Sequence, residues 1–107
     1  MHVAACTVNG RIAPKYYDAT QLLSLIIEGE TVVQQKIITV EELNPHELCS
    51  LVLHMKVDVV ICGGIRKDYQ QKLKGPSVQL IFNVIGKTDD VIKRFVEGNL
   101  HTGDIVN

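Results

Sequence analysis

Residues 57–65 read Val57-Asp58-Val59-Val60-Ile61-Cys62-Gly63-Gly64-Ile65, and this stretch decides the fold. Its first six residues are apolar almost throughout and do not alternate with polar residues. A strand of this kind is buried on both faces, as is typical of a parallel strand inside a sheet. The two glycines end the strand, and we expect a second helix to begin at them. The stretch therefore predicts a parallel strand-helix unit in an α/β protein.

A helix is predicted immediately before this strand, over residues 45–55. Asn44 is a favoured N-cap, Pro45 suits the first helical position, and Glu47 completes a capping box with Asn44. Apolar residues then recur at the spacing of one helical face. The helix and the strand after it together predict a crossover that is covered by helices.

The other elements are predicted from the same kinds of pattern. Apolar runs bounded by turn residues indicate three strands before the first helix and one more after the second. These strands cover residues 3–8, 20–28, 31–40 and 78–84, and a third helix capped by Thr88 ends near Gly98. The order is β-β-β-α-β-α-β-α, which gives a mixed five-stranded sheet with flanking helices. Residues 1–100 form one domain, and residues 101–107 are expected to be a loose tail.

Composition excludes several classes of protein. The chain has 107 residues, 46% of them hydrophobic, and a formal net charge of −1 without a basic stripe, so nucleic acid is not an expected partner. No apolar run is long enough to span a membrane. Three widely spaced cysteines, without a C-x-x-C pair, favour a reducing cytoplasm over a disulfide framework. No cluster of carboxylates suits a two-metal nuclease, so we expect no enzyme activity.

The end of the residue 57–62 strand is the candidate binding site, because ligands of α/β sheets bind at the carboxyl ends of parallel strands. Glycine admits a ligand close to the backbone, and a helix N-terminus attracts anions. An accessible thiol there would have a lowered pKa. The alternative interpretation is a tight turn beside a small buried cysteine. The candidate residues are Cys62, Gly63, Gly64, Ile65 and Arg66, with Asn9, Gly10 and Tyr16 from the early loop (residues 10–18) and the turn before it.

Cysteine positions suggest a soft-metal site. Cys6 lies near the end of the first strand, which is expected to neighbour the strand of Cys62, so Cys62 and Cys6 are the candidate metal ligands. Thiolates suit iron, copper and molybdenum–sulfur chemistry. Cys49 shares a face of the first helix with His46, and a solvated face is the favoured interpretation there.

Ordered motifs resemble the dinitrogenase iron-molybdenum cofactor biosynthesis family. They are the I-C-G-G-I run at Ile61–Ile65, the V-x-G turn at Val84–Gly86, the F-x-x-G-x-L ending at Phe95–Leu100, and the early Asn9-Gly10, Pro14 and Ala19. The early loop lacks the histidine that many family members carry. The resemblance implies a ribonuclease-H-like fold and a non-catalytic protein that binds, carries or helps to assemble a metal–sulfur cluster.

The predicted function is therefore binding or carriage of an iron-sulfur or molybdenum-containing cluster or its precursor. Its expected partners are the metallocluster and assembly proteins. Two alternatives remain open at this point. One is a cofactor-free interaction or regulatory module that forms a homo-oligomer. The other is a binder of a small anionic metabolite.

Overall fold

A mixed six-stranded sheet forms the centre of the computed structural model, which describes residues 1–107. Along the sheet the strands follow the order β4-β3-β1-β5-β6, and the short β2 pairs with β1. The neighbours of β1 are the antiparallel β3 and the parallel β5, and β6 runs parallel to β5. The strands are β1 (His2–Val8), β2 (Arg11–Ile12), β3 (Gln21–Glu28), β4 (Thr31–Thr39), β5 (Val59–Ile61) and β6 (Gln79–Ile81).

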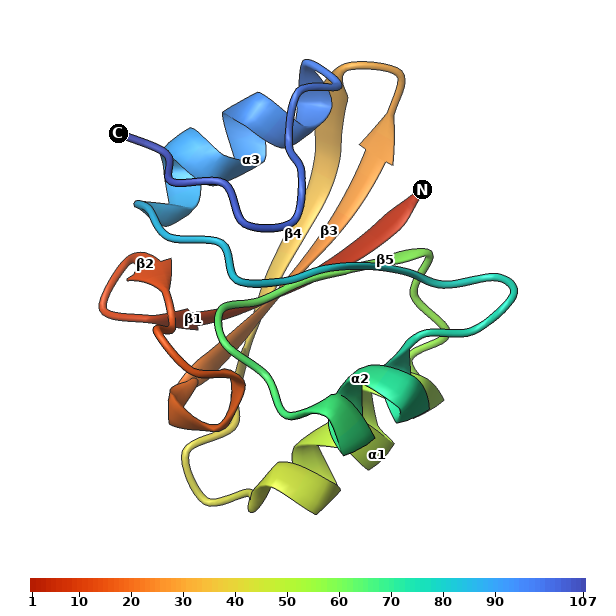
Figure 1. The fold of residues 1–107 in the computed structure, drawn as a ribbon. Helices are drawn as coiled ribbons and strands as arrows, with labels where there is room; N and C mark the ends of the chain where they lie inside the picture. The colour runs from red at the N-terminus through yellow and green to blue at the C-terminus, as the bar shows by residue number, and fades with distance from the viewer.

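Helices cover both faces of this sheet. Figure 1 shows α1 and α2 below the sheet and α3 above it. The helices are α1 (Pro45–His54), α2 (Lys67–Leu73) and α3 (Thr88–Val96), and a single 3-10 turn, η1 (Tyr16–Asp18), lies in the early loop. The capping box of Asn44 and Glu47 is confirmed, with Glu47 N–H donating to Asn44 Oδ1 at 2.8 Å. None of the helices is long and apolar enough to cross a membrane.

The predicted mixed α/β fold with flanking helices is therefore confirmed, with one strand more than expected. β2 escaped prediction because it has only two residues, fewer than the alternation of a strand needs to be visible. A second difference concerns α2, which begins at Lys67 rather than at the glycines. The third concerns α3, whose N-cap is Lys87 instead of Thr88.

Two apolar cores lie on the two faces because successive residues of β1 point in opposite directions. Ala4 and Cys6 pack toward α1 and α2, whereas Val3 and Ala5 pack toward α3. The apolar periodicity of the strands and helices predicts a core of eleven residues, and seven of these are buried, namely Val3, Ala5, Leu48, Val52, Val59, Ile61 and Leu80. Four others are only half-buried, namely Leu51, Phe82, Ile92 and Phe95.

The C-terminal residues are packed, contrary to the expectation of a loose tail. Val106 N–H donates to Ile85 O at 2.7 Å, and Ile85 N–H donates to Asp104 O at 3.0 Å. The side chain of Val106 is only 5% exposed and joins the core on the α3 side. Residues 101–107 thus close one end of that core.

Shortening the buried side chain of Val106 should destabilise the fold. We predict that Val106→Ala lowers the free energy of unfolding by about 1–3 kcal/mol, because it removes two buried methyl groups. The neighbouring Ile105 is 63% exposed, so Ile105→Ala serves as the matched control and should change stability by less than about 0.5 kcal/mol. Urea titration measures both, and equal effects would contradict the docking of the segment.

Candidate functional site

The Gly63-Gly64 turn lies directly under the backbone of the early loop. A Cβ atom on Gly63 would stand 2.1 Å from Ala13 O and 2.6 Å from Pro14 O. Gly64 N–H donates to Pro14 O at 2.8 Å, and Tyr16 N–H donates to Gly64 O at 2.7 Å. The turn therefore meets the early loop as expected, but the space above Gly63 is filled by the protein's own chain.

This contact changes what the turn can bind. The second helix does not begin at the glycines, and Gly64 N–H already donates to Pro14 O, so Gly64 offers no free N–H group to an anion. Gly63 is needed for the close approach of two backbone segments, which neither interpretation of the motif included. Cys62 is buried, as the alternative interpretation held. A ligand can reach this region only beside Gly64, outside the crossing.

Both candidate metal ligands are sealed inside the core. Cys6 and Cys62 have no exposed surface, and they lie in one cluster on the α1–α2 side of the sheet. Their strands pair in parallel, with Ala5 opposite Ile61, so the two cysteines follow in adjacent positions. Burial raises the pKa of the Cys6 thiol to about 12 and also raises the pKa of Cys62 well above its usual value. The expectation of a lowered thiol pKa required an accessible thiol, and neither of these two is accessible.

Tyr16 lies among these thiols rather than at a pocket mouth. It is buried, its hydroxyl donates to Pro45 O at 2.9 Å, and its ring lies 5.5 Å from that of Tyr69. Cys49, expected on a solvated face, is also buried in this cluster. All three cysteines are free thiols, and no group of three or more His, Cys, Asp or Glu side chains is placed to hold a metal ion. The cluster of Tyr16 and the three cysteines is therefore part of the apolar core on the α1–α2 side of the sheet.

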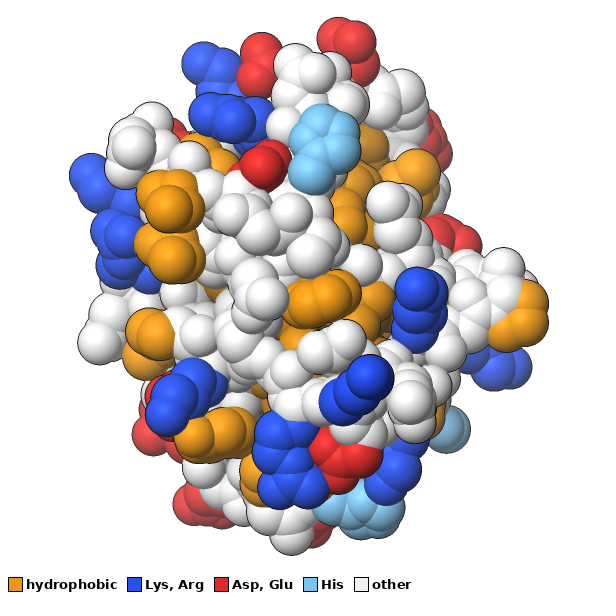
Figure 2. All heavy atoms as spheres, in the orientation of Figure 1, with side chains coloured by type: hydrophobic (Ala, Val, Ile, Leu, Met, Phe, Trp, Pro, Cys, Tyr) orange, Lys and Arg blue, Asp and Glu red, His pale blue; other side chains and the backbone are white.

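An open hollow of about 310 Å³ lies next to the glycine turn. It joins the early loop to the segment before α2, and its lining residues are Lys15, Tyr17, Gly64, Ile65 and Arg66. In Figure 2, basic and apolar side chains lie together over η1 and the start of α2. Three of the predicted binding residues, Gly64, Ile65 and Arg66, meet here.

Two cations, Lys15 and Arg66, are the charged residues that line this hollow. The Lys15 ammonium lies 5.6 Å from the centre of the Tyr17 ring, and the Arg66 guanidinium lies 5.4 Å from that of Tyr69. The neighbouring Tyr17 side chain raises the pKa of Lys15, and the hydrogen bonds to Asp68 raise the pKa of Arg66. Both side chains carry a positive charge at neutral pH. Arg66 uses two N–H groups on Asp68, at 3.1 and 2.6 Å, and keeps three further donors.

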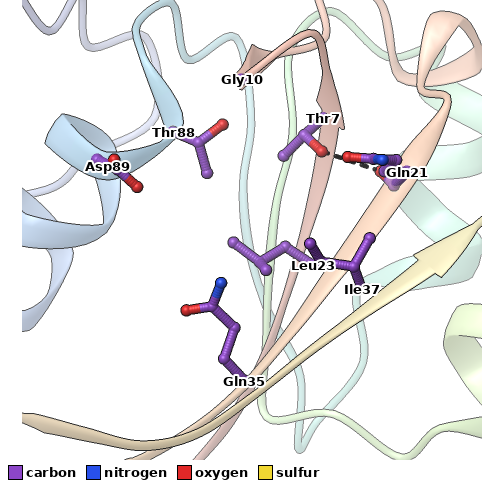
Figure 3. Close-up of a pocket in the computed structure, with 8 residues that line it drawn as sticks. All are labelled: Thr7, Gly10, Gln21, Leu23, Gln35, Ile37, Thr88 and Asp89. Atoms are coloured by element: carbon purple, nitrogen blue, oxygen red, sulfur yellow. Dashed lines mark hydrogen bonds between the residues drawn. The ribbon is translucent and has the colours of Figure 1, made fainter.

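Asn9 and Gly10 lie elsewhere, at the N-terminus of α3. Gly10 lines a pocket of about 160 Å³ with Thr88 and Asp89 of α3, Thr7 of β1, Gln21 and Leu23 of β3, and Gln35 and Ile37 of β4 (Figure 3). The buried Thr88 hydroxyl has no hydrogen-bond partner, because Lys87 takes the capping position. Asp89 is the only charged residue of this lining, so an anion would meet a like charge there.

Sequence reasoning missed Lys15. It allowed both Tyr16 and Tyr17 to line the mouth of a pocket but kept only Tyr16 among the binding residues, whereas Tyr17 lines the hollow. A signal was present, because Lys15-Tyr16-Tyr17 follows Pro14 in a loop expected to face the glycines. Which tyrosine turns inward depends on η1, a single turn that local patterns do not reveal.

Comparison with known proteins identifies solved structures of the same fold. No protein-family model matches the chain, and no curated protein matches it. The crystal structure of PH0822 superposes with a TM-score of 0.85 at 21% identity, covering 95% of this chain and 94% of the other. The NMR structure of a protein named "putative dinitrogenase (MJ0327)" from Methanococcus jannaschii gives a TM-score of 0.75 at 22% identity, over 95% and 92% of the two chains. The crystal structure carrying that name, from Methanocaldococcus jannaschii, gives 0.76 at 24% identity, over 94% and 91%.

These likenesses show the class of fold, a mixed α/β domain shared over nearly the whole chain. Two of the similar structures bear a name from nitrogenase chemistry, in line with the family that the motifs resemble.

Substitution of Gly63 tests the crossing of the early loop. We predict that Gly63→Ala lowers the free energy of unfolding by about 1–3 kcal/mol, because the added methyl group collides with two backbone oxygens. Gly75→Ala is the matched control, since no atom lies within 4 Å of its added Cβ. Urea titration of both variants is the measurement, and a Gly63→Ala protein as stable as the control would show that the loop does not cross there.

Thiol chemistry tests the sealing of the core. We predict that Cys6 and Cys62 resist iodoacetamide in the folded protein at pH 8 and react once it is unfolded in urea, as mass spectrometry would show. The Cys6 thiol ionises near 9.0 in the unfolded chain and near 12 in the folded one. Stability present below pH 9 is therefore lost as the pH rises toward 12. Rapid labelling of either residue in the folded state would contradict the burial.

Proposed function

We propose that this protein is a non-catalytic carrier that binds an anionic metal–sulfur cluster or its precursor in the hollow beside Gly64. The observation that carries the proposal is the lining of that hollow, which holds the cations Lys15 and Arg66. The Asp68 carboxylate, which pairs with Arg66, lies outside the lining. The cluster is cargo, and expected partners are the proteins that assemble or receive it. The relation to nitrogenase cofactor biosynthesis is supported by the motif resemblance and by the names of two structures of similar fold.

The donor set indicates how such cargo is held. Direct ligation by Cys6 or Cys62 does not fit, because both thiols are buried and burial favours their protonated forms. Binding through the charge of the cargo fits better, since Lys15 supplies a point charge and Arg66 supplies a planar fork of donors. Tyr17 and Ile65 add apolar surface beside these charges, which suits a large, polarizable sulfide-rich anion.

Tetrathiomolybdate, a small molybdenum–sulfur dianion, is a direct probe of this proposal. Its binding to the purified protein is measured by equilibrium dialysis under anaerobic conditions. We predict that Arg66→Gln and Lys15→Gln each weaken binding about two- to fivefold and that the double variant weakens it further, as for partly exposed charges. Lys67→Gln is the matched control, because this neighbouring cation is outside the lining.

Two further variants separate the modes of binding. Cys62→Ser should leave tetrathiomolybdate binding unchanged if the cargo is held by charge. Loss of binding in this variant would overturn the proposed charge-based binding in favour of thiolate ligation. Inorganic phosphate serves as the comparison ligand, because a binder of small anionic metabolites would take it equally well. Absence of tetrathiomolybdate binding, or binding that ignores both cation variants, would overturn the proposal.

A further inference from the structure

The outer edge of β4 is long and unprotected. β4 has nine residues, pairs only with β3, and is exposed over nearly its whole length, whereas the opposite edge strand, β6, has only three residues. Val33 is 50% and Ile37 56% exposed. Natural proteins protect such edges with charges, prolines or bulges. β4 has one charged residue, Lys36, no proline, and one bulge near its start.

The sequence of β4 is self-complementary. It reads T-V-V-Q-Q-K-I-I-T from Thr31 to Thr39, with Gln35 at its centre. Reading outward from Gln35, each residue meets one of similar kind: Gln34 and Lys36, Val33 and Ile37, Val32 and Ile38, Thr31 and Thr39. A strand that pairs with its own copy about a two-fold axis through Gln35 therefore matches polar with polar and β-branched with β-branched residues, and no like charges meet.

The backbone hydrogen bonds allow the same arrangement. Ile27 exchanges hydrogen bonds with Met1, so it turns its polar groups toward β1. In an antiparallel sheet this direction alternates along the strand, so Ile26 and Ser24 turn toward β4. Their opposites on β4 are Gln34 and Lys36. Gln34 and Lys36 therefore direct their backbone N–H and C=O groups toward β3. The alternate residues of β4, Gln35 and Ile37, direct theirs toward the open edge.

We propose that two copies of this chain associate through β4, antiparallel and two-fold symmetric about Gln35, so that the two sheets become one continuous sheet. Such an isologous contact uses the same edge twice, which is the usual form of a two-fold dimer. Val33 of each copy lies opposite Ile37 of the other, which covers two of the exposed apolar side chains of the edge. Val33 is also the extra residue of the β-bulge. The regular pairing about the axis therefore covers Gln34–Lys36, and the contacts between Val33 and Ile37 flank it on both sides.

Sedimentation equilibrium from about 10 µM to about 1 mM tests the association. The chain has a mass of 11.9 kDa, and we expect the wild type to approach twice this mass as its concentration rises. Ile37→Lys places a cation against the apolar Val33 of the second copy and should weaken association at least tenfold. Leu53→Lys is the matched control, because Leu53 is an exposed apolar residue on α1, away from the edge.

A pair of double variants tests the register. Val33→Lys/Ile37→Lys sets like charges opposite each other and should leave the protein monomeric. Val33→Glu/Ile37→Lys sets a carboxylate of each copy against an ammonium of the other and should restore the dimer. A wild type that stays monomeric at about 1 mM would overturn the proposal. So would a dimer unaffected by Ile37→Lys, or two double variants that behave alike.

Discussion

The backbone of the early loop crosses directly over Gly63, and the arrangement of the whole binding end of the sheet depends on this crossing. Ala13 and Pro14 occupy the space that any side chain at position 63 would need. The crossing closes the carboxyl end of β5, where a parallel sheet would otherwise admit a ligand. It also brings Lys15 beside Gly64, through the paired backbones of the two segments. The same contact thus fills the space above Gly63 and places Lys15 on the wall of the hollow beside it.

Charge and sulfur are separated by this arrangement. The thiols lie inside, around Tyr16, where low polarity keeps them protonated. The cations lie outside, where Arg66 and Lys15 carry their charges in contact with aromatic rings. Chemistry at the surface is therefore governed by charge and by polarizable ring faces rather than by metal–thiolate bonds. That distinction is the reason why the proposed binding of cargo relies on charge.

The hollow and the β4 edge lie on different parts of the molecule. β4 is one edge of the sheet, and two strands, β3 and β1, separate it from β5, which leads into the glycine turn (Figure 1). A dimer formed through β4 leaves the two hollows uncovered by the paired strands themselves. The proposed binding and the proposed association therefore involve different residues, so we expect variants of one surface to leave the other intact.

The sequence alone determined the order of the long strands and the helices, the parallel character of the residue 57–62 strand, and the cap of α1. Those features follow from local patterns, such as the apolar run of β5 and the spacing of Asn44 and Glu47. It also predicted that a ligand at the glycine turn would face the early loop, and the two segments do meet. Local patterns failed at β2 and η1, because each is too short to show a period.

Only the tertiary structure decided what the glycine turn is for. A pair of glycines permits close approach, but whether a ligand or the chain itself makes that approach depends on where the early loop folds. The same holds for Cys62, whose thiol is reactive or inert according to its burial. Lys15 and Arg66 are far apart along the chain, and their meeting at one hollow is set by backbone pairing through space. Contacts of that kind arise when distant segments pack together, so no local pattern around either residue could have shown them.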